Sequence, residues 1–272
     1  MSDIALINDS QQSAIVTNGI GKNGEIYMKA AGSTDAGALV VYDSGNWRKF
    51  ADEASSYSNA YSVSFDGTND YIQLPNGVLS TLTGTAYTIS MWYNLDVVGS
   101  YQEIFTAGSN LQIYFRPRTT QVGLELYVNG AGRIIQPSPY SNVGSWVHGC
   151  ISVDTTGTST MYINGSFSAS SPSVPQPTSV SNPVIGSFNG ASNFLNGLVD
   201  EVAIFSSTLS SSDVTAIYNS GVPTDLTSYS PVGWWRMGDN DGGTGTTITD
   251  QGSGSNDGTL TNGPTFSSSV PS

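Results

Sequence analysis

Tyr87-Thr-Ile-Ser-Met-Trp-Tyr93 and Gly123-Leu-Glu-Leu-Tyr-Val128 show the pattern that decides the fold of this chain. Apolar and polar residues alternate in both, as in a strand that buries one face. Short runs of the same kind recur along the chain, and Asn-Gly, the strongest short hairpin signal, recurs with them. Its positions are Asn18, Asn23, Asn76, Asn129, Asn164, Asn189, Asn196 and Asn262. Many short strands at regular spacing predict an all-β sandwich or barrel.

One short helix is also predicted. Ser210 is a good N-terminal cap, and Asp213 stands where a capping box needs its acidic residue. Val214 and Ile217 fall on one face of such a helix, and Gly221 ends it. A single helix of this length is expected to pack against the β-sandwich without defining the fold.

Composition narrows the function. Apolar residues make up 38% of the 272 residues and charged residues only 11%, so the surface is largely neutral and polar. The formal net charge of −13 disfavours nucleic-acid binding and attracts divalent cations. Cys150 is the single cysteine, so no internal disulfide is expected. Neither a signal peptide at Met1–Ser10 nor a membrane-length apolar run is present, so no membrane insertion is expected.

The chain is expected to have two parts. Residues 1–52 contain three short strand-like runs, which are too few to enclose a core without a partner. We interpret them as an N-terminal segment for attachment or oligomerisation. Residues 53–272 form the main domain, and residues 231–272 supply its final outer strand and loop. That strand includes Gly233-Trp-Trp-Arg-Met237, whose tryptophans argue against a disordered tail.

Residues 61–220 resemble the laminin-G-like members of the concanavalin-A-like jelly-roll superfamily. Three stretches carry the resemblance, in the family's order: Ser64-Phe-Asp-Gly-Thr-Asn-Asp-Tyr-Ile72, Trp146-Val-His148 with Met161-Tyr-Ile-Asn-Gly165, and Asn196-Gly-Leu-Val-Asp-Glu-Val-Ala-Ile-Phe205. The resemblance implies a two-sheet antiparallel jelly-roll sandwich. The same fold is found in lectins, adhesins and glycosidases, so it does not by itself settle function.

Residues 19–50 resemble short Gly-rich modules of phage virion proteins. This second resemblance implies a virion surface protein, a fibre or decoration protein, that is held by other virion proteins through residues 1–52. We expect it to be a homo-oligomer that displays a lectin-like domain to a glycan or host surface. One alternative is a purely structural capsid or tail decoration protein without a ligand. The other is a glycoside hydrolase or lyase of the same fold.

The family resemblance also implies a structural calcium ion. Asp200 matches an aspartate that holds calcium in many of these jelly rolls, and Asp66 and Asp70 lie in a loop that can approach it. Hard oxygen ligands on loops suit calcium. The alternative is that Asp66 and Asp70 only form Asx turns.

Sugars bind on exposed aromatic rings flanked by polar groups. The candidates for such contacts are Tyr101, Tyr114, Tyr127, Arg116 and Arg118. The two arginines form the densest basic spot of an acidic chain and suit acidic glycans. The alternative is that the tyrosines are ordinary packing residues of the sheets.

No enzyme active site is predicted. His148 is the single histidine, and no Gly-x-Ser-x-Gly elbow accompanies it. The paired-carboxylate strand motif of glycosidases with this fold is missing. Glu103 and Glu125, on separate strands, remain open as a carboxylate pair, although we interpret them as solvated surface residues.

Overall fold

The computed structural model describes residues 5–7, 26–29, 39–43, 46–49, 57–117, 121–130, 132–137 and 141–272. The chain divides into two compact units, Met1–Tyr57 and Ser58–Ser272. The division expected after residue 52 falls outside the described residues. No helix in the described ranges is long and apolar enough to cross a membrane.

The described part of the N-terminal unit is a small sheet. Its strands follow the order β1-β2-β3-β4, with β1 parallel to β2 and the other pairs antiparallel. The bounds are β1 Ala5–Ile7, β2 Ile26–Lys29, β3 Leu39–Asp43 and β4 Asn46–Lys49. The three later strands match runs that the sequence pattern predicts, whereas β1 was not predicted.

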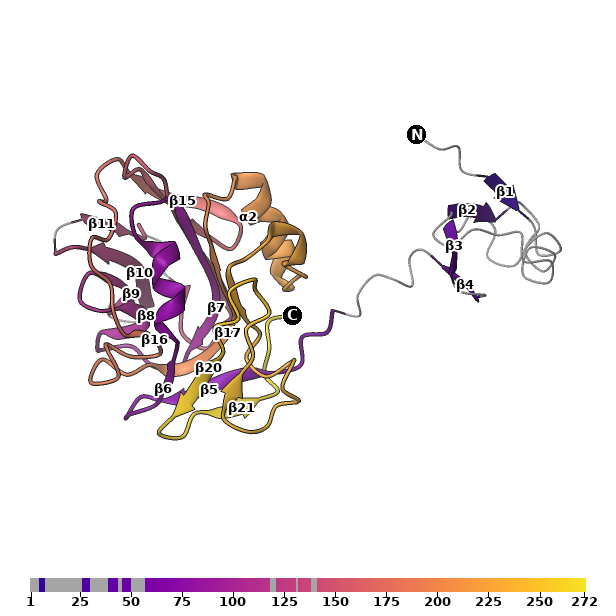
Figure 1. Cartoon of the computed structure of the whole chain (residues 1–272). Helices are drawn as coiled ribbons and strands as arrows, with labels where there is room; N and C mark the ends of the chain where they lie inside the picture. Colours follow the sequence, from indigo (N-terminus) through magenta and orange to yellow (C-terminus); the bar gives the residue numbers. More distant parts are fainter. Residues whose placement is uncertain are drawn as a thin grey trace. The chain divides into compact units, whose positions relative to one another are not determined.

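The second unit consists of two antiparallel sheets placed face to face (Figure 1). Within the described residues, one sheet has nine strands: β6 Tyr71–Gln73, β8 Gln102–Ala107, β9 Leu111–Pro117, β10 Gln121–Val128, β11 Gly132–Ile135, β12 Ser141–Asn142, β16 Pro183–Ile185, β19 Thr247–Ile248 and β20 Gly258–Thr261. The other has eight: β5 Ser62–Asp66, β7 Tyr87–Leu95, β13 Val147–Val153, β14 Ser159–Ile163, β15 Ser166–Ser171, β17 Asn196–Phe205, β18 Gly233–Trp235 and β21 Thr265–Ser267. The predicted two-sheet sandwich is confirmed.

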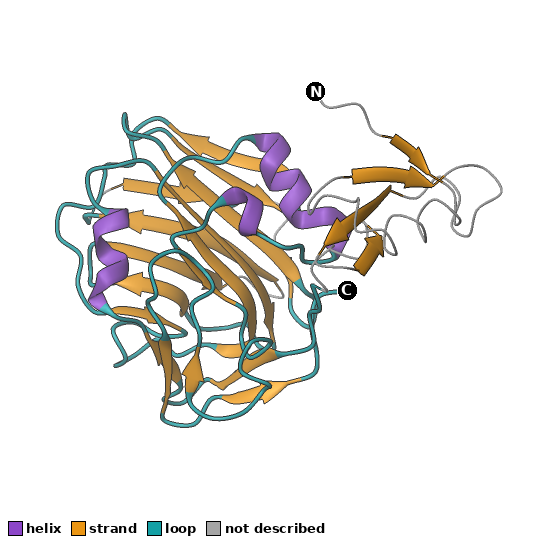
Figure 2. Cartoon of the chain, turned by 45° about the vertical axis from the view of Figure 1, so that its right-hand side comes forward, coloured by secondary structure: helices purple, strands orange, loops and turns teal. Residues whose placement is uncertain are grey.

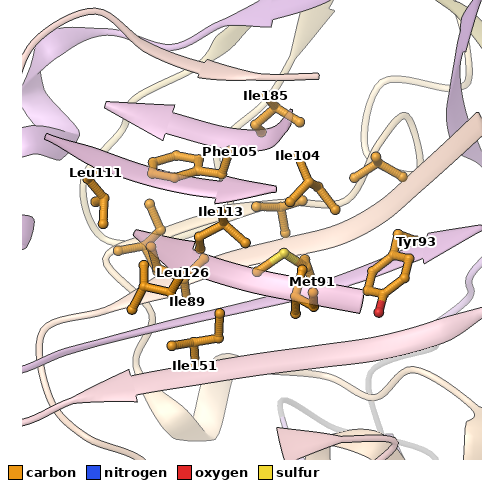
Figure 3. Packing of buried hydrophobic residues seen from close by; sticks show 14 of the residues in the cluster. Ile89, Met91, Tyr93, Ile104, Phe105, Leu111, Ile113, Leu126, Ile151 and Ile185 are labelled. Carbon is orange, nitrogen blue, oxygen red and sulfur yellow. The ribbon is translucent and has the colours of Figure 1, made fainter. Parts of the chain in front are cut away.

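The core lies between the sheets and is filled from alternate strand positions. Ile89 and Met91 of β7 face Phe105 of β8 and Ile113 of β9 (Figure 3). All four side chains are at most 1% exposed. Full burial of such a side chain contributes about 1.5–3 kcal/mol, so this layer is the main source of stability. The 3₁₀ helix η2 (Asn76–Leu82) connects β6 in one sheet to β7 in the other.

Both faces of β7 and β13 are buried, which differs from the single buried face expected from the sequence. Their outer faces carry Ser90, Trp92 and His148, and α2 (Ser211–Tyr218) lies over them (Figures 1 and 2). The ring of Tyr218 stacks on Trp92 at 5.7 Å between centroids, and His148 Nε2 lies 2.8 Å from Ser90 Oγ. Burial lowers the pKa of His148 to about 3. His148 is therefore neutral and structural.

Helix α2 forms as the sequence predicts. The Ser210 side chain accepts from the backbone N–H of Asp213, and the Asp213 carboxylate accepts from the N–H of Ser210. Val214 and Ile217 are buried. The helix ends at Asn219, which takes a left-handed conformation, two residues before the predicted Gly221. Two 3₁₀ turns follow, η3 (Asn219–Gly221) and η4 (Thr227–Tyr229).

The C-terminal segment is part of the sandwich. Strand β18 pairs with β17, β20 extends the nine-stranded sheet next to β6, and β21 extends the eight-stranded sheet next to β5. The Asp250 carboxylate holds the intervening loop by accepting from the N–H groups of Trp234, Gly252 and Asn256 at 2.7–2.8 Å. Residues 231–272 thus contribute four strands to the sandwich, β18, β19, β20 and β21, together with the loops between them.

Candidate functional site

A row of side chains crosses the outer face of the nine-stranded sheet. Strand register places Tyr114 of β9 between Glu103 of β8 and Glu125 of β10. The next row places Tyr127 of β10 opposite Arg133 of β11. Paired residues on adjacent antiparallel strands point to the same side, so these five side chains share one face.

Tyr101 precedes β8 and completes this face. Its side chain is 47% exposed, and its ring lies 5.6 Å from that of Tyr114 in an edge-on arrangement. Tyr114 is only 7% exposed, so Tyr101 presents most of the accessible aromatic surface of the pair. We call Tyr101, Glu103, Tyr114, Glu125, Tyr127 and Arg133 the tyrosine surface.

Glu125 is the polar centre of the tyrosine surface. Its Oε1 accepts from the Tyr114 hydroxyl at 2.5 Å and lies 3.1 Å from Nε of Arg133. The guanidinium carbon of Arg133 also stands 5.0 Å from the centre of the Tyr127 ring. Burial, and after it the hydrogen bond to Glu125, raises the pKa of Tyr114, so the phenol stays a neutral donor. These contacts fix both tyrosine rings in place before any ligand arrives.

Glu103 has a different environment. Its Oε1 accepts from Nδ2 of Asn193 at 3.3 Å, while its Oε2 is buried without a hydrogen-bond partner in the described part of the chain. Burial raises the pKa of Glu103 to about 8. At neutral pH the protonated acid therefore predominates, because the ionised form would lie in a poorly solvated site.

The carboxylate pair left open by the sequence does share one face, but it is not solvated. Glu103 is 2% and Glu125 is 0% exposed, so the prediction of solvated surface residues was wrong. The two lie two strands apart, which is about 10 Å between Cα atoms. Tyr114 and Arg133 contact the Glu125 carboxylate, and Asn193 contacts that of Glu103.

Of the sequence-predicted ligand residues, the structure brings three tyrosines together, Tyr101, Tyr114 and Tyr127. Arg116 belongs to strand β9, but the structure does not describe its side chain. Arg118 lies outside the described residues. Arg133 was missed. The Asn129-Gly130 hairpin gave a signal for it, since the register of that hairpin places Arg133 opposite Tyr127.

The three aspartates predicted for calcium do not meet. Asp66 pairs with Asn196, four residues before Asp200 on β17, so Asp66 and Asp200 are separated by about 13 Å along the strands. Asp66 Oδ1 accepts from the N–H of Thr68, and Asp70 Oδ2 from the N–H of Asp66, so both carboxylates shape the loop.

Asp200 is fully buried, and both its oxygens accept hydrogen bonds, from Nδ2 of Asn59 and from the N–H of Glu201. Burial raises the pKa of Asp200 well above its usual range, and the Glu201 carboxylate raises it further. The described residues contain no group of three or more His, Cys, Asp or Glu able to hold a metal. The three aspartates therefore do not form one group of ligands, and a structural calcium ion stays a prediction.

The comparisons with known proteins address the fold. No curated protein sequence matches the chain. A proposed carbohydrate-binding protein from Bacteroides ovatus has a similar structure, with a TM-score of 0.61 and 19% identity over 92% of this chain and 71% of that one. Domain 4 of the extracellular arabinanase AbnA from Geobacillus stearothermophilus, solved with arabinotriose, gives a TM-score of 0.48 and 21% identity over 75% of this chain and 95% of that domain. At these identities the likeness concerns the fold alone.

The family model described as the concanavalin A-like lectin/glucanases superfamily matches residues 66–215. That range is more than half of the 272-residue chain and runs from the end of β5 into α2. It covers the whole tyrosine surface. The chain therefore belongs to the concanavalin A-like lectin/glucanase superfamily and carries its jelly-roll sandwich.

Proposed function

We propose that the second unit is a non-catalytic carbohydrate-binding domain whose ligand lies on the tyrosine surface. The observation that carries the proposal is the half-exposed ring of Tyr101, seated against Tyr114 and beside the Arg133–Glu125 ion pair. A sugar ring offers an apolar face to such an aromatic ring and hydroxyl groups to the polar groups around it. The structural likeness to the Bacteroides ovatus protein is consistent with this proposal.

Binding is favoured over hydrolysis by the burial of the two carboxyl groups. Glycoside hydrolysis needs one acid in contact with the glycosidic oxygen and a second carboxylate in contact with water or the sugar. Glu103 and Glu125 are 2% and 0% exposed, so neither carboxyl group is accessible to a sugar on this face. Glu125 is also engaged by Tyr114 and Arg133, so its lone pairs serve the framework of the site.

The test is the affinity of the Tyr101→Ala variant. A panel of neutral and acidic oligosaccharides first selects the tightest ligand of the full chain, and calorimetric titration then compares the variants. Removal of a central contact tyrosine is expected to cost about 2 kcal/mol, or about thirtyfold in affinity.

Phe167→Ala is the matched control, because Phe167 is an exposed aromatic residue, 65% exposed, on β15 of the other sheet. It is expected to bind like the unaltered chain. Equal affinities for Tyr101→Ala and the unaltered chain would remove the tyrosine surface from consideration as the binding site.

We further propose that the N-terminal unit attaches this domain to a virion surface, as an oligomer. Its four described strands are only three to five residues long, at the short end of the usual range, and a unit of this size is marginally stable alone. The N-terminal units of several copies of the chain can pack against one another and bury the surface that a single unit leaves exposed. Several copies of a weak sugar-binding domain would gain avidity from being linked.

Light scattering on the full chain and on a shortened chain beginning at Ser58 tests the attachment proposal. The expected result is an oligomer for the full chain and a monomer for the shortened chain. A monomeric full chain that also fails to associate with any purified virion protein would contradict it.

A further inference from the structure

A polar pocket lies on the outer face of the eight-stranded sheet, on the side of the sandwich opposite the tyrosine surface. Its volume is about 190 Å³, and its lining includes Asp154, Thr158, Thr160, Tyr162, Thr208 and Leu209. A pocket of this volume suits a ligand the size of one sugar ring. Helix α2 starts at Ser211, just beyond Leu209, and leaves this part of the sheet open.

Hydrogen bonds hold one wall of this pocket in place. Thr88, Ser152 and Thr160 lie side by side on β7, β13 and β14. The Thr88 hydroxyl donates to the carbonyl of Ser207 and accepts from the N–H of Leu209, at 2.8 and 3.1 Å. Since its one proton is used there, Ser152 Oγ donates to it across 2.9 Å. The loop that carries Thr208 is thus tied to the sheet at two points.

The turn after β13 forms the facing wall. Asp154 Oδ1 accepts from the N–H and the hydroxyl of Thr156 and from the N–H of Thr158, at 2.7–2.9 Å. The Thr156 hydroxyl is the largest cause of a lowered pKa at Asp154, so the group is ionised at neutral pH. Within the described residues the hydroxyls of Thr160 and Thr208 make no hydrogen bond, so both hydroxyls remain available to a ligand.

The chemistry of the available atoms selects the ligand. A single carboxylate with no cation beside it in the lining repels anions. It accepts hydrogen bonds, whereas the two threonine hydroxyls both donate and accept. Tyr162 and Leu209 add apolar surface. We propose that this pocket binds one neutral sugar residue, separately from the tyrosine surface and on the opposite sheet.

Saturation-transfer NMR on the full chain tests the pocket, with free glucose, galactose, mannose, fucose, N-acetylglucosamine and glucuronate as probes. At least one neutral sugar is expected to bind, and glucuronate is not. Thr160→Val and Thr208→Val each remove one hydroxyl at nearly constant shape, and each is expected to weaken binding about tenfold or more. Val222→Ala, at an exposed position outside the pocket lining, is expected to leave monosaccharide binding unchanged.

The pocket proposal is overturned if no neutral sugar receives transfer from the folded chain, or if both threonine variants bind as the unaltered chain does. It is also overturned if Tyr101→Ala abolishes the monosaccharide signal. Circular dichroism of each variant confirms that it is folded. Oligosaccharide binding that withstands Tyr101→Ala, beside monosaccharide binding that depends on Thr160, would defeat the tyrosine surface and leave the pocket standing.

Discussion

Replacement of Trp235 by alanine is expected to remove about 3–5 kcal/mol from the stability of the second unit. Trp235 is completely buried, and its indole N–H donates to the carbonyl of Asn256 at 2.9 Å. Gly233 leaves room for this ring, since a Cβ at that position would meet it at 2.5 Å. The substitution therefore leaves a large cavity and an unpaired carbonyl between β18 and the C-terminal loop. The free energy of unfolding of a typical domain is about 5–15 kcal/mol, so the expected loss is a large fraction of the total.

Urea unfolding followed by far-UV circular dichroism measures this loss without relying on tryptophan fluorescence. Val222→Ala is the control, because Val222 is 46% exposed and close in sequence to β18. Its unfolding free energy is expected to stay within about 0.5 kcal/mol of the unaltered chain. A Trp235→Ala protein as stable as the control would mean that residues 231–272 are appended to the sandwich and do not complete it.

Replacement of Glu103 by glutamine is expected to stabilise the protein at alkaline pH. The folded-state pKa of Glu103 is about 8, against an ordinary value of 4.5, because burial disfavours the charged form. A carboxyl group with a raised pKa in the folded state contributes to the free energy of unfolding. That contribution is fully present below about pH 4.5 and is lost as the pH rises to about 8. Between pH 5 and pH 8 this loss is on the order of 4 kcal/mol. Glutamine mimics the neutral acid and removes that pH dependence.

The measurement is the unfolding free energy of both proteins at pH 5 and pH 8. Asp200, whose pKa is also raised, is present in both proteins, so its contribution cancels in the comparison. Val222→Ala is the control, because it changes an exposed residue without a titratable group and is expected to keep the pH dependence of the unaltered chain. Identical pH dependence in Glu103→Gln and the unaltered chain would show that Glu103 is already ionised at pH 5.

Local signals in the sequence predicted the local structure. Ser210 and Asp213 form the capping box that they indicate, because both partners lie within one turn. Asn129-Gly130 and Asn164-Gly165 turn the hairpins β10–β11 and β14–β15. Asn196-Gly197 does not form a turn, since it begins strand β17. There a Cβ would meet the carbonyl oxygen of Asn94 at 2.3 Å, so this glycine serves a contact with a distant strand that no local pattern contains.

The candidate site was predicted only in part, because some of its features also depend on contacts between residues far apart in the sequence. Tyr101, Tyr114 and Tyr127 were predicted as ligand contacts because aromatic residues flanked by polar ones are typical of sugar sites. The burial of Glu103 and Glu125 was not predicted, since it depends on residues distant in the sequence. Asn193, for example, lies ninety residues after the carboxyl group of Glu103 that it contacts. The separation of Asp66 from Asp200 depends on strand register, which the spacing of these residues in the sequence does not reveal.

Backbone amide chemical shifts of the full chain, titrated with the oligosaccharide that it binds most tightly, test the central claim most directly. Sugar binding on the tyrosine surface predicts the largest shifts at Tyr101, Glu103, Tyr114, Tyr127 and Arg133, on adjacent strands of one sheet face. It also predicts little change in α2. Saturating oligosaccharide that leaves these five amides unmoved, while shifts gather elsewhere, would contradict the account.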